Sequence, residues 1–217
     1  MRKKCLFLCI GIIIFWSGGV SADTISWIDW QSTSVGSLTV GSEIVGVTMS
    51  GSPWDLVDGD ANYNNSYTNY TSETGTYAGL QPSDVIRVSG VGGSANFILS
   101  FDTAIIDPYI ALVSVGAHEA PVTYSFNSSF SVVSSGHNKW GYTGYSVDGN
   151  AFTGEEYNGI LKFMGTYSSI SFNITPDEHW HGFNFGVSDL APIPEPTTML
   201  LLGIGLIGLA GARRKME

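Results

Sequence analysis

The chain has 217 residues, a formal net charge of −10 and two cysteines, and both cysteines lie within its first nine residues. The segment 23–190 therefore has no cysteine, and its 17 acidic residues outnumber 3 basic ones, which gives it a formal charge of −14. This composition excludes disulfides, thiolate nucleophiles and Cys-ligated zinc, and the charge repels phosphate backbones, so nucleic acid is excluded as a partner.

The N-terminus has the three parts of a secretory signal peptide. Basic residues at 2–4 precede an apolar stretch at 5–16, and small residues at 20–22 follow. A retained membrane anchor is disfavoured, because the apolar stretch is short and the small side chains suit signal peptidase. We therefore predict that segment 1–22 is removed between Ala22 and Asp23 and that the rest of the chain is exported.

Segment 23–190 alternates apolar and polar residues in several short runs. Such alternation of aromatic and β-branched residues predicts half-buried strands, and the Gly, Asn, Ser and Asp clusters between the runs predict turns. We therefore predict an all-β domain, an antiparallel β-sandwich with a jelly-roll-like strand order. Segment 154–165 allows a helical turn instead, although Gly159 disfavours a long helix. The residues predicted to share faces are Phe97, Leu99 and Phe101; Ala111, Val113 and Val115; Val122, Tyr124 and Phe126; Ile170, Phe172 and Ile174; and Phe183, Phe185 and Val187.

A short acidic stretch, WDLVDGDANYN, carries the best candidate for a metal site. Asp58, Asp60 and Asn62 alternate there, and Asp55 precedes them. Oxygen ligands at this spacing can converge on a hard cation, so we predict an irregular Ca²⁺ site. An EF-hand is excluded, because its turn Gly and its bidentate Glu are both missing. The alternative is a polar turn built on Asp58 and Gly59. Segment 60–79 is rich in Asn, Thr and Tyr and has no apolar face, so we predict a long surface loop or an irregular edge hairpin there.

The acidic and histidine residues of 23–190 do not form a catalytic pattern. Glu155 and Glu156 are adjacent, so on a strand they would point to opposite faces, whereas glycosidases need two carboxylates that face each other across the sugar. His179 and His181 would share one face of a strand, but interfacial histidines explain them better than a metal site does. We therefore predict that the protein is not an enzyme.

Aromatic residues offer a second kind of candidate site. The chain has six tryptophans and ten tyrosines, and aromatic faces stack on sugars while Asn and Asp side chains bind hydroxyl groups. Trp27, Trp30, Trp54 and Trp140 are the candidates for stacking on a carbohydrate. The alternative is that each of them packs in the core of the sandwich.

The C-terminal segment 191–217 has a different composition from the domain before it. Prolines at 192, 194 and 196 favour a stiff extended spacer. Residues 197–212 carry no charge, and as a helix they would span about 24 Å at 1.5 Å per residue. This is short of a hydrocarbon core of about 30 Å. The basic residues at 213–215 would stop transfer and stay in the cytoplasm.

This arrangement resembles the PEP-CTERM sorting signal of exported bacterial proteins. The matching elements are the triplet Pro194, Glu195 and Pro196, the Leu- and Gly-rich segment 199–212, and the basic cluster Arg213, Arg214 and Lys215. The resemblance implies processing by an exosortase, a membrane-embedded enzyme of bacteria that secrete exopolysaccharide. It further implies that 197–212 holds the chain in the inner membrane only transiently, with residues 23–190 outside. The same kind of tail is also catalogued as an ice-binding protein's C-terminus, a label that describes the tail alone.

Two functions remain open for residues 23–190. The first is a non-enzymatic role at the cell surface or in the extracellular matrix, by adhesion or by binding exopolysaccharide. The second is hydrolysis of polysaccharide by a secreted enzyme. The sorting tail, the acidic cysteine-free composition and the missing catalytic pattern favour the first function.

Overall fold

The computed structural model describes residues 25–53, 55–57, 85–88, 95–136, 144–175, 178 and 181–190. Every regular element in these ranges is a β-strand. The predicted signal peptide at 1–22 and the predicted sorting segment at 191–217 lie outside them, as does the predicted loop at 60–79. Within the described ranges, no helix is present that is apolar and long enough to cross a membrane.

The strands form two sheets, which we call sheet A and sheet B, and all their pairings are antiparallel. Sheet A has seven strands, in the order β10 (Phe130–Gly136), β13 (Tyr157–Phe163), β8 (Tyr109–Val115), β15 (His181–Val187), β6 (Val85–Val88) and β5 (Asp55–Val57), with β1 (Ser26–Trp27) also paired to β15. Sheet B has nine strands, in the order β11 (Gly144–Asp148), β12 (Ala151–Glu155), β9 (Val122–Phe126), β14 (Thr166–Thr175), β7 (Ala95–Ile106), β4 (Glu43–Ser50), β3 (Val35–Val40) and β2 (Asp29–Trp30), with β16 (Asp189–Leu190) also paired to β7.

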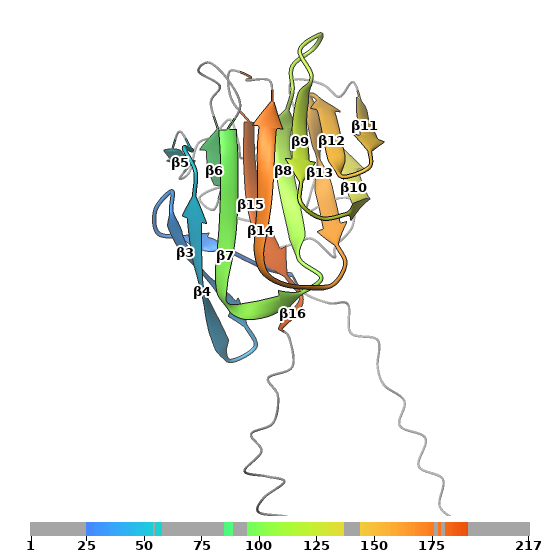
Figure 1. Cartoon of the computed structure of the whole chain (residues 1–217). Coiled ribbons are helices and arrows are strands. Elements are labelled where there is room, and N and C mark those ends of the chain that lie inside the picture. Colours follow the sequence, from blue (N-terminus) through green and yellow to red (C-terminus); the bar gives the residue numbers. More distant parts are fainter. Residues whose placement is uncertain are drawn as a thin grey trace, which may run out of the picture.

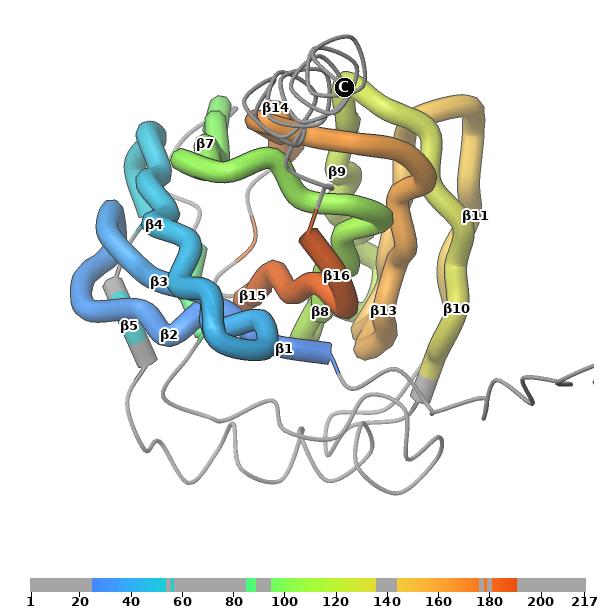
Figure 2. The backbone as a smooth tube through the Cα atoms, turned by 90° about the horizontal axis from the view of Figure 1, so that it is seen from below, coloured from blue at the N-terminus to red at the C-terminus, as the bar shows by residue number. Residues whose placement is uncertain are grey.

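The two sheets stack face to face, and the main apolar core lies between them (Figure 1). The end-on view places β7 and β14 of sheet B across from β8 and β15 of sheet A (Figure 2). Four of the five predicted sets of shared faces are confirmed, because all their members are buried in this core. These sets are Phe97, Leu99 and Phe101; Val122, Tyr124 and Phe126; Ile170, Phe172 and Ile174; and Phe183, Phe185 and Val187.

The fifth set was wrong at one residue. Ala111 and Val113 lie in a second apolar cluster, whereas Val115 lies in the main core. The reason is an irregularity in β8, where Ser114 has a left-handed φ of 51° and the register with β13 shifts. An extra residue in one strand of a pair reverses the direction of the side chains that follow it.

The second apolar cluster buries the other face of sheet A. Val113, Ala111 and Ile160 point there together with Trp27 and Ile25, which flanks β1. β8 and β15 are therefore buried on both faces. Gly186 of β15 permits the close approach of β1, because a Cβ at this position would lie 2.7 Å from atoms of both Ile25 and Trp27.

Segment 154–165 contains no helical turn, so that alternative was wrong. The segment runs through β13, which pairs with β10 on one side and β8 on the other. Gly159 leaves room for the ring of Tyr157, whose hydroxyl donates a 2.7 Å hydrogen bond to the carbonyl of Ser134 on β10. Gly159 therefore makes room for the hydrogen bond between Tyr157 and Ser134, and the helix propensity of glycine does not predict this role.

Candidate functional site

The outer face of sheet B is lined with short hydroxyl and amide side chains. They occupy the alternate strand positions that point away from the core. Three surface hollows lie along this face, one over β3, β4 and β7, one over β7, β14 and β9, and one beside β11 and β12. The outward polar residues include Ser37, Thr48, Asn96, Ser100, Thr123, Ser125, Thr153, Ser169, Ser171 and Asn173.

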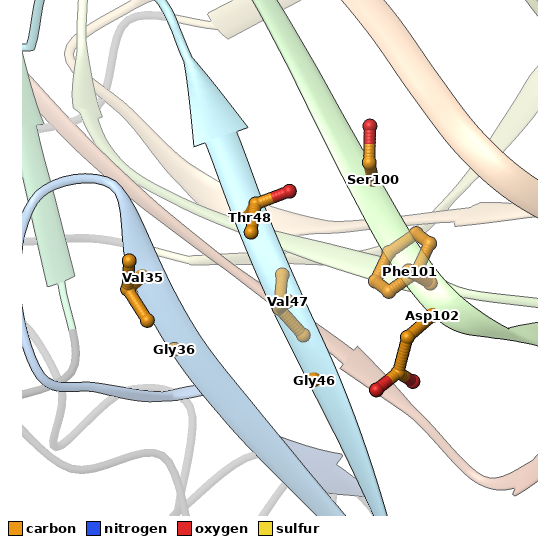
Figure 3. Close-up of a pocket in the computed structure, with 8 residues that line it drawn as sticks. All are labelled: Val35, Gly36, Gly46, Val47, Thr48, Ser100, Phe101 and Asp102. Atoms are coloured by element: carbon orange, nitrogen blue, oxygen red, sulfur yellow. The ribbon is translucent and has the colours of Figure 1, made fainter.

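The first hollow has a volume of about 400 Å³ (Figure 3). Thr48 and Ser100 lie opposite each other in the register of β4 and β7 and line the hollow together with the half-exposed side chain of Val35. The carboxylate of Asp102 extends over Gly46, where a Cβ would come within 2.6 Å of Oδ2. The missing side chain at position 46 therefore provides the space that the carboxylate occupies.

The central hollow has a volume of about 380 Å³ and is lined by two rows of side chains. One row contains Asn96, Asn173 and Ser125, which are in register across β7, β14 and β9. The second row contains Ile98 and Ser171, which are also in register, and Asn127, whose Oδ1 accepts a 3.2 Å hydrogen bond from the backbone N–H of Ser171. Neighbouring strands lie about 4.8 Å apart, so each row extends about 10 Å across the sheet.

The third hollow, of about 360 Å³, continues the face toward the β11 edge. Its lining includes Glu155 and Thr153, whose hydroxyl is paired with that of Thr123 at 2.8 Å. Tyr145 also belongs to the lining, but its ring, 43% exposed, lies on the inward side of β11, where it stacks on buried Phe152 with ring centroids 5.7 Å apart. Together, the three hollows follow an oblique line across the strands of sheet B.

The described strands of sheet B contain no basic residue. Both described cations, Arg87 and Lys162, lie on sheet A, whereas acidic residues of sheet B include Asp102 and Glu155 in the hollows. Lys162 is 3.6 Å from an oxygen of Asp107 and 5.2 Å from the ring centroid of Tyr109. The outer face of sheet B is thus neutral to negative and rich in hydrogen-bonding groups.

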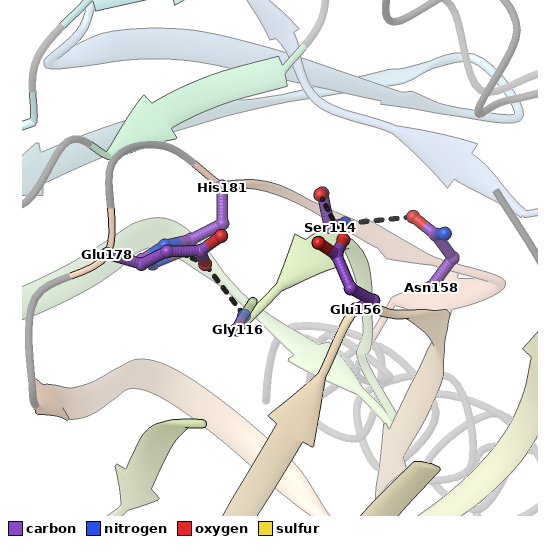
Figure 4. A network of polar contacts seen from close by, with 6 residues as sticks. All are labelled: Ser114, Gly116, Glu156, Asn158, Glu178 and His181. Carbon is purple, nitrogen blue, oxygen red and sulfur yellow. Dashed lines mark hydrogen bonds and ion pairs between the residues drawn. The ribbon is translucent and has the colours of Figure 1, made fainter. Parts of the chain in front are cut away.

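A separate polar network lies where β8, β13 and β15 approach one another (Figure 4). The amide oxygen of Asn158 accepts a 2.8 Å hydrogen bond from the backbone N–H of Ser114, and the hydroxyl of Ser114 donates a 3.2 Å bond to Glu156. Ser114 and Glu156 both have φ values of 51°, which are unfavourable for residues with a side chain. These bonds hold the irregular segment of β8 against β13.

The second half of this network joins Glu178 to β8 and β15. Oε2 of Glu178 accepts a 2.7 Å hydrogen bond from the backbone N–H of Gly116 and lies 3.4 Å from Nδ1 of His181. The latter is an ion-pair distance without hydrogen-bond geometry, because neither ring nitrogen of His181 has a hydrogen-bond partner. The imidazole is 1% exposed and packs edge-on against the ring of Tyr124. We interpret this half of the network as structural, because Glu178 is committed to the backbone of Gly116.

The structure describes only part of the predicted metal and catalytic sites. Asp58, Asp60 and Asn62 lie outside the described residues, and Asp55 begins β5 opposite Arg87. In the described ranges, no group of three His, Cys, Asp or Glu residues is close enough to hold a metal ion. Of the two adjacent glutamates, Glu156 binds Ser114, whereas Oε1 of Glu155 accepts a 2.8 Å hydrogen bond from the backbone N–H of Glu119.

The tryptophans that the structure describes are not available to stack on a carbohydrate. Trp27 is 8% exposed and Trp30 is 4% exposed, and the indole N–H of Trp30 donates a 2.9 Å hydrogen bond to Asn184. The packing alternative is therefore the right one for both residues. Trp54, Trp140 and His179 lie outside the described ranges.

Sequence reasoning missed the outer face of sheet B, because Ser and Asn at alternate positions indicate only the solvent side of a strand.

Comparison with known proteins identifies the tail. A family model described as the PEP-CTERM protein-sorting motif matches residues 192–215. The chain is thus a PEP-CTERM domain-containing protein, of the class that is exported and sorted by an exosortase. The predicted residues Glu195 and Arg213 lie within the match, and their individual roles stay predictions. Neither the curated proteins nor the solved structures contain a match to the chain.

Proposed function

We propose that this exported protein binds polysaccharide in the cell envelope and that it does so without catalysis. The observation that carries the proposal is the outer face of sheet B, where amide and hydroxyl groups line three hollows. Hydroxyl-rich ligands are bound by such groups, and the short side chains leave the face accessible. The sorting motif supports the location, because it directs the protein to the cell surface.

The strand order supports a jelly-roll connectivity. Strands β6, β15, β8 and β13 are neighbours in sheet A, and β7, β14, β9 and β12 are neighbours in sheet B. Consecutive strands from β6 to β9 and from β12 to β15 thus alternate between the sheets, as in a double Greek key. We regard β1 to β5, β10, β11 and β16 as additions to this arrangement. Because jelly rolls host many functions, the fold alone does not decide between binding and catalysis.

The route to the envelope is proposed from the tail and the N-terminus. Signal peptidase removes residues 1–22, and segment 197–212 then holds the chain in the inner membrane with the β-domain outside. Exosortase acts at the Pro-Glu-Pro triplet and releases the protein from this anchor. Mass spectrometry of the mature protein would test the first step, since Asp23 should be its N-terminal residue.

The proposal is tested by incubating the detergent-solubilised full-length chain with a panel of soluble polysaccharides. Affinity gel electrophoresis should show retardation by at least one of them, and the reducing-sugar assay should detect no release of product. Turnover that a single carboxylate substitution abolishes would support the hydrolase instead. A chain that migrates unchanged through every polysaccharide of the panel would refute the proposed function.

A further inference from the structure

We propose that the ligand is an uncharged polysaccharide chain that lies across the strands of sheet B, with its main contacts in the central hollow. This inference rests on the proposed function and adds the chemical class of the ligand, its site and its direction. The residues that form the site are the two rows of the central hollow, Asn96, Asn173 and Ser125, and Ile98, Ser171 and Asn127.

The central hollow offers hydrogen-bonding groups that the fold does not use. Among the described residues, the hydroxyls of Ser125 and Ser171 have no partner, although each could both donate and accept. Asn96 uses its Oδ1 to accept a 3.0 Å hydrogen bond from Asn173, which leaves its amide N–H groups for a ligand. Donors and acceptors thus alternate over a small area, as the hydroxyls of a sugar require.

One apolar side chain lies among these polar groups. Ile98 is 48% exposed and is in register with Ser171. In the first hollow, Val35 is likewise 48% exposed, close to Thr48 and Ser100. A sugar ring presents apolar C–H groups as well as hydroxyls, so an exposed aliphatic side chain beside hydrogen-bonding groups matches both kinds of surface.

The charge of the face determines which polysaccharides fit. Uronates, sulfates and phosphates need cationic partners, and the described part of sheet B has none. Asp102 in the first hollow and Glu155 in the third place carboxylates on both sides of the central hollow. A carboxylate on the ligand would lie near one of them and would be repelled. The complementary ligand is therefore uncharged.

The positions of the hollows determine the direction of the chain. The first and central hollows share β7, and the third hollow lies beyond β9. A chain that runs from Thr48 over Ser171 to Thr153 passes all three. This path crosses the strands obliquely, because the register puts Thr48 level with Ser169 and Thr153 level with Thr175 on β14. A chain parallel to the strands would pass at most the two hollows that share β7, so a path that crosses the strands gives the larger contact area.

The test compares two tyrosine substitutions at exposed positions of this face. Ser125→Tyr fills the central hollow, whereas Thr39→Tyr lies on β3 outside all three hollows and serves as the matched control. Tyrosine has a high strand propensity, so both variants should keep the fold, which circular dichroism and the unfolding midpoint will show. The probes are dextran, hydroxyethylcellulose and galactomannan as neutral chains, and alginate as an anionic chain.

We expect the full-length chain to be retarded by at least one neutral probe and not by alginate. Ser125→Tyr should weaken that association at least about tenfold, as the loss of a central contact does, and Thr39→Tyr should leave it unchanged. Binding of alginate alone, or equal binding by Ser125→Tyr and the unaltered chain, would overturn this inference while the proposed function stands. Failure to bind any of the four probes would overturn both.

Discussion

The side-chain oxygen of Asn158 accepts a 2.8 Å hydrogen bond from the backbone N–H of Ser114, a residue 44 positions earlier on the neighbouring strand. The amide of Asn158 thus replaces a backbone partner that the irregular register between β8 and β13 removes. The bond is buried, and a buried N–H group without an acceptor is costly. The side chain of Asn158 therefore stabilises the segment of β8 at which the alternation of inward and outward side chains is reversed.

Substitution Asn158→Ala should lower the free energy of unfolding by about 1–3 kcal/mol, because the N–H of Ser114 would lose its acceptor in a buried site. Urea denaturation of the mature protein measures this change. Asn150→Ala, which removes an exposed amide between β11 and β12, is the control and should change stability by less than about 0.5 kcal/mol. Equal stability of the two variants would contradict the role assigned to Asn158.

Glu178 should stabilise the protein mainly by accepting the hydrogen bond of the Gly116 backbone N–H, and less by its ion pair with His181. Glu178→Ala removes the partner of the Gly116 N–H, and we expect a loss of about 1–3 kcal/mol. Glu178→Gln keeps an oxygen for this bond, so its loss should be smaller, as thermal denaturation can measure. If both variants lose the same stability, the ion pair with His181 is the larger contribution, contrary to this expectation.

The Lys162 ammonium should stabilise the protein up to alkaline pH. Burial lowers the pKa of Lys162, but its contacts with Tyr109 and Asp107 outweigh that effect, so the pKa is raised above the usual 10.5. A raised pKa in the folded state gives stability that is present below pH 10.5 and is lost as pH rises through the folded pKa. We expect the charged ammonium of Lys162 to contribute about 0.5 kcal/mol to the free energy of unfolding. The stability of the unaltered protein relative to Lys162→Met should therefore fall by about 0.5 kcal/mol as pH rises through the folded pKa of Lys162, and a difference that does not change with pH in that range would contradict this origin.

Calcium should raise the melting temperature if Asp58, Asp60 and Asn62 form the predicted site. Binding to the native state alone stabilises a protein by about 2.7 kcal/mol at a hundredfold excess of ligand over Kd. Melting curves in excess Ca²⁺ and in chelator should therefore differ by several degrees, and Asp58→Ala should abolish the difference. Identical curves for the unaltered protein would remove the calcium hypothesis.

Glu195→Ala should block processing of the tail without blocking export. The apolar segment and the basic cluster remain intact, so the uncut precursor should accumulate in the membrane with its β-domain outside. Replacing the basic residues 213–215 with neutral ones should instead release uncut protein across the inner membrane. A C-terminal peptide map of the mature protein measures both outcomes. A mature protein that retains residues 199–212 in cells with the exosortase would show that the tail is a permanent anchor.

Local pattern and composition were enough to determine the fold class and the destination of this protein. The alternation around Phe97 and Phe172 predicts strands and their inward faces, because the side chains of a strand alternate regardless of its partners. The sorting motif at 192–215 is also a local feature, because its triplet, apolar segment and basic cluster follow one another along the chain. It could therefore be found from the sequence without the fold.

Only the tertiary structure decided which residues are brought together from distant parts of the chain. Val115 points into the main core because β8 is irregular at Ser114. This irregularity in turn depends on Asn158, whose side-chain oxygen accepts the hydrogen bond of the Ser114 backbone N–H. The central hollow likewise depends on the register of three strands, which sets Asn96 and Ser125 on either side of Asn173. Strand pairing is a long-range interaction, so no local pattern specifies it, and serines and asparagines that look like ordinary solvent-facing residues become one surface only when the sheet forms.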